Sequence, residues 1–253
     1  MNTARLYLLL ASGLLGLAGT ASAAIIFSED FTNTAAAAAR FTVTATDGGW
    51  NGAKVSYAAN NATIEAYQGL RLNLRTNLAN NFSLDHGDVP VIYSVIESLS
   101  AKTGAKQSFF YVRLGETGYS DGYYLSHYND GSSTTLSFYR LNGGVGTQLY
   151  TSGIKSVFNN TDPVTMAVTL ANNLDGSVTY TLQYGAFSLT GTDTSANAIT
   201  SGSGVGVGFN NNGTADWLSG TFDNLTVTTI PEPAALGLLG LAGLFLAGRR
   251  QRR

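Results

Sequence analysis

The sequence predicts an all-β domain built as a two-sheet antiparallel sandwich, with an apolar segment at each end of the chain. The first observation is composition: the 253 residues include 30 Gly, 13 Tyr and 12 Phe, and only 12% are charged. Aromatic and β-branched side chains suit a pleated sheet, and Gly tolerates the positive φ angles of tight turns. The other two observations are short apolar runs and the turn signals between them. We place the domain at residues 24–229, between terminal segments 1–23 and 230–253.

Ten short runs of alternating or continuous apolar residues predict the strands of this sandwich. Turn signals separate the runs, and the one at 172–177 predicts a hairpin over 164–182. Short strands without parallel crossovers favour two packed antiparallel sheets, a sandwich or jelly roll. In chain order the predicted strands are 40–45, 70–74, 91–96, 108–114, 122–128, 136–141, 164–170, 178–182, 205–209 and 222–227.

Charge and cysteine content exclude several classes of function. The formal net charge is −2, but the segment between the two ends has nine Lys and Arg against fifteen Asp and Glu, a net charge of −6. An acidic domain argues against nucleic acid or an anionic membrane surface as a partner. The chain has no Cys, so it has no disulfides, no thiolate metal ligands and no thiol nucleophile.

The N-terminal segment 1–23 has the parts of a secretory signal peptide. Arg5 precedes an apolar run over 6–19, and the small residues Ala21 and Ala23 form an A-x-A cleavage site. We therefore expect the mature chain to begin at Ala24. The alternative is a buried first helix of the fold, which the lack of any polar face on this run disfavours.

The C-terminal segment combines a proline motif, an apolar helix and an arginine cluster. Pro231, Glu232 and Pro233 precede an apolar stretch over 234–248 that we predict to be a transmembrane helix. This helix would span about 22 Å, against a bilayer core of about 30 Å. The positive-inside rule keeps the arginines cytoplasmic and places the domain on the far side. An ordinary membrane anchor is the alternative. The arginines are Arg249, Arg250, Arg252 and Arg253.

These three parts, in this order and paired with a signal peptide, resemble the PEP-CTERM sorting signal of Gram-negative bacteria. The resemblance implies an exosortase-type sorting protease as partner and cleavage near 231–233. It also implies a transient inner-membrane intermediate, followed by transfer to the cell surface or the extracellular space. Proteins with this signal are commonly associated with exopolysaccharide and biofilm matrix. The resemblance covers about the last two dozen residues and says nothing about the chemistry of the middle of the chain.

The middle of the chain is similar to the concanavalin A-like and laminin G-like jelly rolls. Residues 27–31 and 220–227 resemble the first and last strands of that superfamily, which lie side by side. Sugar-binding members often hold a structural Ca²⁺ near these strands, and the oxygen ligands that the resemblance implies here are Glu29, Asp30 and Asp223. Calcium is the only cofactor that the sequence suggests. The alternative is that these acids are solvated or cap the edge of a sheet.

A row of tyrosines in the 119–130 segment is the candidate ligand-binding feature. Strand alternation places Tyr124, Ser126 and Tyr128 on one face and Tyr123, Leu125 and His127 on the other. An exposed row of Tyr124 and Tyr128 beside Asp130 would stack on sugar rings and bond to their hydroxyls. The alternative is ordinary half-buried packing of the sheet.

Catalytic patterns are missing from the sequence. Glycoside hydrolases of the resembled fold use a Glu-x-Asp-x-x-Glu strand, and no such pattern occurs; the Glu residues of the domain lie far apart in sequence. His86 and His127 lack the spacing of a zinc protease, and there is no G-x-S-x-G elbow. We therefore expect a non-enzymatic surface or matrix protein that acts by adhesion or structural spacing. A carbohydrate-binding lectin-like module is the alternative, and a secreted glycoside hydrolase ranks third.

Overall fold

A computed structural model describes residues 23–45, 53–58, 60–67, 69–77, 89–116, 118–153, 162–213 and 216–230. The short helix α2 (Thr34–Arg40) and every strand reported below belong to one compact unit, Ile25–Thr229. The predicted signal peptide, apart from exposed Ala23, lies outside the described residues, and so do the proline motif, helix 234–248 and the terminal arginines. Among the helices that the structure describes, none is long and apolar enough to cross a membrane.

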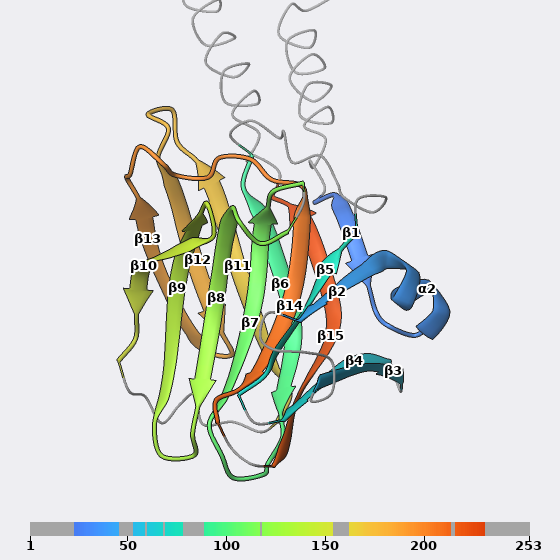
Figure 1. Cartoon of the computed structure of the whole chain (residues 1–253). Coiled ribbons are helices and arrows are strands. Elements are labelled where there is room, and N and C mark those ends of the chain that lie inside the picture. The colour runs from blue at the N-terminus through green and yellow to red at the C-terminus, as the bar shows by residue number, and fades with distance from the viewer. Residues whose placement is uncertain are drawn as a thin grey trace, which may run out of the picture. The chain divides into compact units, whose positions relative to one another are not determined.

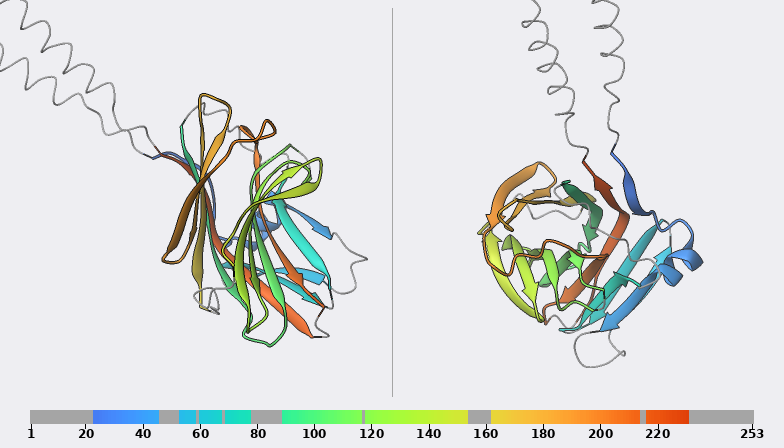
Figure 2. Two further views of the ribbon diagram at one scale, coloured as in Figure 1. Left: turned by 90° about the vertical axis from the view of Figure 1, so that its left-hand side faces the viewer. Right: turned by 90° about the horizontal axis from the view of Figure 1, so that it is seen from above.

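The described strands form two antiparallel sheets, as predicted (Figure 1). The left view of Figure 2 shows them as two layers, with β11–β13 in one and β7–β9 in the other. In spatial order the eight-stranded sheet comprises β13 (Phe187–Asp193), β12 (Val178–Tyr184), β11 (Val164–Asn172), β6 (Val91–Leu99), β15 (Trp217–Thr229), β4 (Asn61–Tyr67) and β3 (Ala53–Ala58), with β1 (Ile25–Glu29) also paired to β15. The seven-stranded sheet comprises β10 (Val145–Thr151), β9 (Thr134–Asn142), β8 (Gly122–Asn129), β7 (Lys106–Leu114), β14 (Gly204–Asn211), β5 (Arg71–Thr76) and β2 (Phe41–Ala45).

All ten predicted strands are confirmed, most of them longer by one or more residues at their ends. The predicted hairpin over 164–182 is β11–β12, in which Asn172 pairs with Val178. Its turn is closed by Asp175, whose carboxylate accepts from the Ser177 amide at 3.0 Å, and by Gly176 at a φ of 83°. The first and last strands also lie side by side, because β1 pairs with β15.

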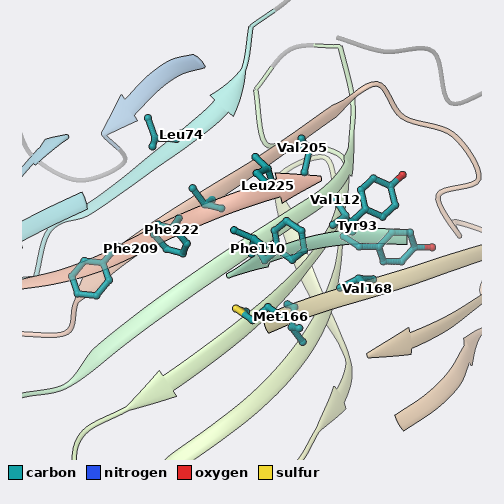
Figure 3. Packing of buried hydrophobic residues seen from close by; sticks show 14 of the residues in the cluster. Leu74, Tyr93, Phe110, Val112, Met166, Val168, Val205, Phe209, Phe222 and Leu225 are labelled. Carbon is teal, nitrogen blue, oxygen red and sulfur yellow. The ribbon is translucent and has the colours of Figure 1, made fainter. Parts of the chain in front are cut away.

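Alternation along the strands gives each sheet one face that packs on the core. In β6 every second residue is buried, from Val91 to Leu99. The buried aromatic rings come from both sheets, with Tyr93 and Phe222 on one and Phe110 and Phe209 on the other (Figure 3). Burial of this much apolar area stabilises the sandwich without any disulfide.

Two buried polar clusters join the sheets inside this core. Glu97 on β6 and His127 on β8 contact each other across the sandwich, with Oε1 and Nδ1 2.6 Å apart. At another point Arg140 on β9 donates to Asp193 on β13 at 2.6 Å, and the Tyr123 hydroxyl donates to the other oxygen of Asp193 at 3.0 Å. Both polar contacts are buried, so each group depends on its partner to offset the cost of desolvation.

The connection from β13 to β14 crosses from one sheet to the other at one end of the sandwich (Figure 1). The Ile199 amide in this connection donates to the Tyr123 hydroxyl at 2.9 Å, and Arg113 donates to the Ile199 carbonyl at 2.7 Å. The hydrogen bonds of Asp193 and Tyr123 therefore link the two sheets to each other and also fix the position of this crossover connection.

Candidate functional site

The outward side of the seven-stranded sheet carries the predicted tyrosine row. Tyr123, Leu125 and His127 are buried in the core, while Tyr124 and Tyr128 are half-buried on the opposite side. The predicted division of β8 into two faces is therefore confirmed. Tyr124 pairs across the strands with Tyr111 on β7 and with Tyr139 on β9.

Four aromatic residues lie around Tyr124 and form with it what we call the aromatic face. The Tyr124 and Tyr139 rings stack with centroids 4.7 Å apart and planes 8° from parallel. Tyr124 also lies 5.6 Å from Tyr111, which meets Tyr119 edge-on at 4.7 Å. Phe109 and Tyr111 are buried at the centre of this cluster, and the other three rings are half-buried around them. The members of the aromatic face are Phe109, Tyr111, Tyr119, Tyr124 and Tyr139.

Glycines in the neighbouring strand β14 allow side chains of β5 to reach this face. On the outward side β14 presents Gly206 opposite Tyr111 and Gly208 opposite Phe109. A Cβ at Gly208 would overlap the side-chain oxygen of Asn73, which comes from β5 on the other side of β14. The same oxygen accepts a hydrogen bond from the Tyr111 hydroxyl at 3.2 Å. Without side chains on β14, polar residues of β5 and rings of β7 meet directly.

Two arginines of β5 lie against the aromatic face. The Arg71 guanidinium carbon is 3.8 Å from the centroid of the Phe109 ring, and Arg71 Nε contacts the Asn73 oxygen at 3.4 Å. Arg75 extends over Gly204 and donates to the carbonyls of Gly115 and Thr76. The Arg71 position is a cation–π contact, in which the ring face attracts the positive charge.

Arg75 carries a buried positive charge without an acidic partner. The residue is 5% exposed, and no carboxylate of the described residues forms an ion pair with it. Burial lowers the pKa of its guanidinium, because desolvation disfavours the charged form. Its Nε also lacks a hydrogen-bond acceptor. A buried cation of this kind is costly unless something else neutralises it.

Further polar atoms on this side of the sheet also lack partners. Buried side-chain atoms are usually hydrogen-bonded, so a group of exceptions calls for an explanation such as water or a ligand. Burial raises the pKa of Tyr119 well above its usual range, and it raises the pKa of Tyr124 to about 12. The unpartnered atoms are Asn73 Nδ2, Arg75 Nε, Tyr119 Oη and Asn210 Oδ1.

Tyr128 and Asp130 lie further along, at the turn that joins β8 to β9. The Asp130 carboxylate accepts from the Ser132 amide at 2.9 Å and from the Ser133 amide at 2.5 Å. These bonds lower the pKa of Asp130, those from the Ser133 and Ser132 amides most strongly. The Tyr128 hydroxyl is 3.5 Å from the other Asp130 oxygen. Asp130 therefore closes its own turn, and its role in binding a glycan stays a prediction.

The three residues predicted to bind calcium do not form a cluster of acids. Glu29 is buried and pairs with Arg40 at 2.8 Å, while Asp30 is exposed and accepts from the Thr32 amide at 3.0 Å. Asp223 lies at a bulge of β15 and accepts from the Asn224 amide at 2.6 Å. Across the described residues, no group of three or more His, Asp or Glu side chains is placed to hold a metal ion. Calcium binding stays a prediction.

The sequence interpretation missed most of the aromatic face and both arginines. Phe109 and Tyr111 alternate on a predicted strand, and Gly204, Gly206 and Gly208 alternate on another. The alternation of glycines was the available signal, because it means that one side of that strand carries no side chains.

Comparisons with solved structures show that the fold of this domain is a two-sheet jelly roll of the concanavalin A-like type. The CBM2 module of the evolved Dit protein of Lactobacillus casei BL23 phage J-1 matches with a TM-score of 0.56 and 12% identity, over 83% of this chain and 98% of that one. A legume lectin-like domain from Entamoeba histolytica matches with a TM-score of 0.56 and 12% identity, over 83% and 100%. The Emp47p carbohydrate recognition domain matches with a TM-score of 0.54 and 16% identity, over 83% and 98%. At these identities the likeness shows the fold alone.

The C-terminal residues identify how the chain is sorted. Residues 229–253 match the family model of the PEP-CTERM protein-sorting motif. This motif implies an exported protein that is sorted to the cell surface and processed by an exosortase. Comparison with curated proteins gave no match.

Proposed function

We propose that this exported protein binds a polysaccharide of the extracellular matrix through the aromatic face and does not cleave it. The observation that carries the proposal is the stack of half-exposed tyrosine rings on the outward side of one sheet. Matrix binding at the cell surface agrees with the sorting motif at residues 229–253.

Sugar recognition needs two kinds of group, and the aromatic face has both. The apolar faces of sugar rings stack on aromatic side chains, and their hydroxyls need hydrogen-bond donors and acceptors close by. Tyr124 and Tyr139 supply ring area, while the exposed polar groups of Tyr139 and Gln148, which are 3.0 Å apart, can bond to sugar hydroxyls.

The acidic residues of the domain support binding without hydrolysis. Glycoside hydrolysis requires two carboxyl groups that flank the scissile bond. None of the seven strands that form this sheet contains Asp or Glu. Of the glutamates, Glu97 is buried against His127 in the core, and Glu65 pairs with Lys54 on the other sheet.

Binding is tested with the surface-released protein on a glycan array, followed by titration calorimetry with each glycan found. We expect Tyr139→Ala to reduce affinity at least about fivefold, because one stacked ring contributes roughly 1 kcal/mol or more. Thr181→Ala, on the outward side of β12, is the matched control and should bind as the native protein does. If no glycan binds, or if both variants bind alike, the aromatic face is structural packing. The remaining function for the protein would then be that of an adhesive or a structural spacer.

Sorting is tested by mass spectrometry of the surface protein from cells with and without the exosortase. We expect the C-terminus of the released chain to lie near Pro231–Pro233 and to depend on the enzyme. Surface material that keeps Arg253 would contradict processing.

A further inference from the structure

The outward side of the eight-stranded sheet carries an exposed tryptophan. Trp217 begins β15 and is 37% exposed. Its neighbour across the strands is Tyr67, the last residue of β4, and the two ring centroids are 5.7 Å apart with the planes tilted by 41°. Alternation buries Leu218 and Ala66 in the core, so Trp217 and Tyr67 face outward. The other large apolar side chains that are exposed in the described part of the chain are aliphatic.

An ion pair of accessible side chains lies beside these two rings. Lys54 on β3 pairs with Glu65 on β4 at 2.9 Å, and Lys54 Nζ lies 5.2 Å from the centroid of the Trp217 ring. The side chains of Lys54 and Glu65 are 61% and 32% exposed, so solvent reaches both. We call these four residues, Trp217, Tyr67, Lys54 and Glu65, the tryptophan surface.

The composition of the tryptophan surface suits a sugar better than a folded protein. The centre of a protein interface is depleted of charged residues, whereas here an ion pair adjoins the exposed ring. A sugar needs aromatic area for its apolar side, and donors and acceptors for its hydroxyls. Trp217 and Tyr67 supply the area, and the ammonium of Lys54 and the carboxylate of Glu65 supply the polar groups.

The position of the tryptophan surface leaves it open to a ligand of its own. It lies on one sheet and the aromatic face on the other, with the hydrophobic core between the sheets. β15 runs from Trp217 to Thr229, and the match to the sorting motif begins at residue 229. At about 3.3 Å per residue, the two ends of this 13-residue strand are roughly 40 Å apart. The tryptophan surface is therefore far from the end of the strand that leads into the motif, and it faces away from the aromatic face.

We infer that the tryptophan surface is a second polysaccharide site, so that one molecule binds two polysaccharide chains and cross-links them. This inference rests on the proposed function and extends it from binding to cross-linking. A short stretch of one polysaccharide chain cannot reach both sides of the sandwich, so the second site recruits another chain.

Tryptophan fluorescence tests the second site separately from the first. The chain has two tryptophans, Trp50 and Trp217, and the aromatic face has none. Cellohexaose, mannohexaose and xylohexaose are titrated into the Trp50→Phe variant of the surface-released protein, in which Trp217 is the single tryptophan. We expect at least one of them to change the Trp217 emission and to protect the ring from acrylamide. The difference between the native protein and Trp217→Phe gives the same signal by a second route. Vesicles of phosphatidylethanolamine and phosphatidylglycerol are the membrane probe and should cause no change.

Light scattering tests cross-linking with the matching polymers, hydroxyethyl cellulose, galactomannan and arabinoxylan. We expect the native protein to form large protein–polymer particles. Trp217→Ala and Tyr139→Ala should each reduce these particles, because each weakens one surface at least about fivefold and keeps the other. Leu174→Ala, at the turn between β11 and β12, also removes an exposed apolar side chain and is the matched control, which should cross-link as the native protein does.

The outcomes separate the inference from the proposed function. If no hexasaccharide changes the Trp217 emission, or if only the vesicles do, the inference is overturned, while binding at the aromatic face stands on its own test with Tyr139→Ala. The inference also falls if Trp217→Ala cross-links as well as the native protein, or if Leu174→Ala loses cross-linking equally. If Trp217 responds but Tyr139→Ala changes nothing, the aromatic face binds no glycan, and both the proposed function and cross-linking fail.

Discussion

The ion pair between Asp193 and Arg140 should be among the most sensitive points of the fold. Asp193 is 2% exposed, and its carboxylate accepts from Arg140 at 2.6 Å and from Tyr123 at 3.0 Å. Asp193→Ala would leave a buried guanidinium and a buried hydroxyl without their acceptor. Breaking a buried pair by removing one partner costs about 3–5 kcal/mol. For a domain of this size, that corresponds to a fall in Tm of about 10 °C.

Glu65→Ala provides the matched control, because it breaks an ion pair on the surface. Its partner Lys54 is 61% exposed, and such pairs contribute about 0–1 kcal/mol. Both variants and the native protein would be unfolded by heat and by urea, with circular dichroism as the readout. Asp193→Asn keeps the volume and one acceptor, so its loss should be intermediate. If Asp193→Ala costs no more than Glu65→Ala, the polar cluster that holds the β13–β14 crossover contributes nothing, and the reasoning is refuted.

Three further predictions concern the seven-stranded sheet. Gly208→Ala should destabilise the protein by about 1–3 kcal/mol, because the added Cβ displaces Asn73; an unchanged urea midpoint would contradict this. The Asp130 carboxyl should titrate below its usual value of 3.8 in an NMR titration, because backbone amides bind its ionised form. Its contribution to stability is therefore present above the unfolded pKa and is lost as the pH falls through the lower folded pKa; titration at or above 3.8 would be the opposite result. The Tyr124 phenol should ionise near pH 12, because burial disfavours the phenolate. Stability from this group is complete below pH of about 10 and is lost as the pH rises through the folded pKa. The change in ultraviolet absorbance that the Tyr124→Phe variant lacks measures its pKa, and ionisation near 10 would contradict the burial.

The sequence predicted strands well where large apolar residues alternate, and it missed strands in which they are few or exposed. β6 buries every second residue from Val91 to Leu99, and its pattern is plain in the sequence. No strand was predicted for the edge strands β3, β10 and β13, nor for β4, which lies inside the eight-stranded sheet and buries two small residues, Ala62 and Ala66, beside Ile64. In β10 the first four residues are exposed, including Val145, so no periodic apolar signal exists there. Such strands form because a neighbour offers hydrogen bonds, which local sequence does not reveal.

Only the part of the candidate site that lies on a single strand could be predicted from the sequence. Alternation within β8 placed Tyr124 and Tyr128 on one side without any knowledge of the other strands. The remainder of the aromatic face depends on which strands are neighbours. β14 lies between β7 and β5, although β5 precedes β7 in the chain and β14 follows much later. Contacts such as Arg71 on Phe109 arise from this order, which a single sequence does not specify.

The outward sides of the two sheets differ in how their polar side chains are satisfied. On the eight-stranded sheet outward hydroxyls pair with each other, such as Thr181 with Thr190 at 2.9 Å and Ser94 with Thr226 at 2.7 Å. On the seven-stranded sheet glycines occupy a central strand, where they weaken the ladder, and buried polar atoms lack partners. Proteins tend to break such local rules at functional sites. The unpartnered atoms near the aromatic face are buried, so the half-exposed rings of Tyr124 and Tyr139 are the part of this side that the proposed glycan would contact.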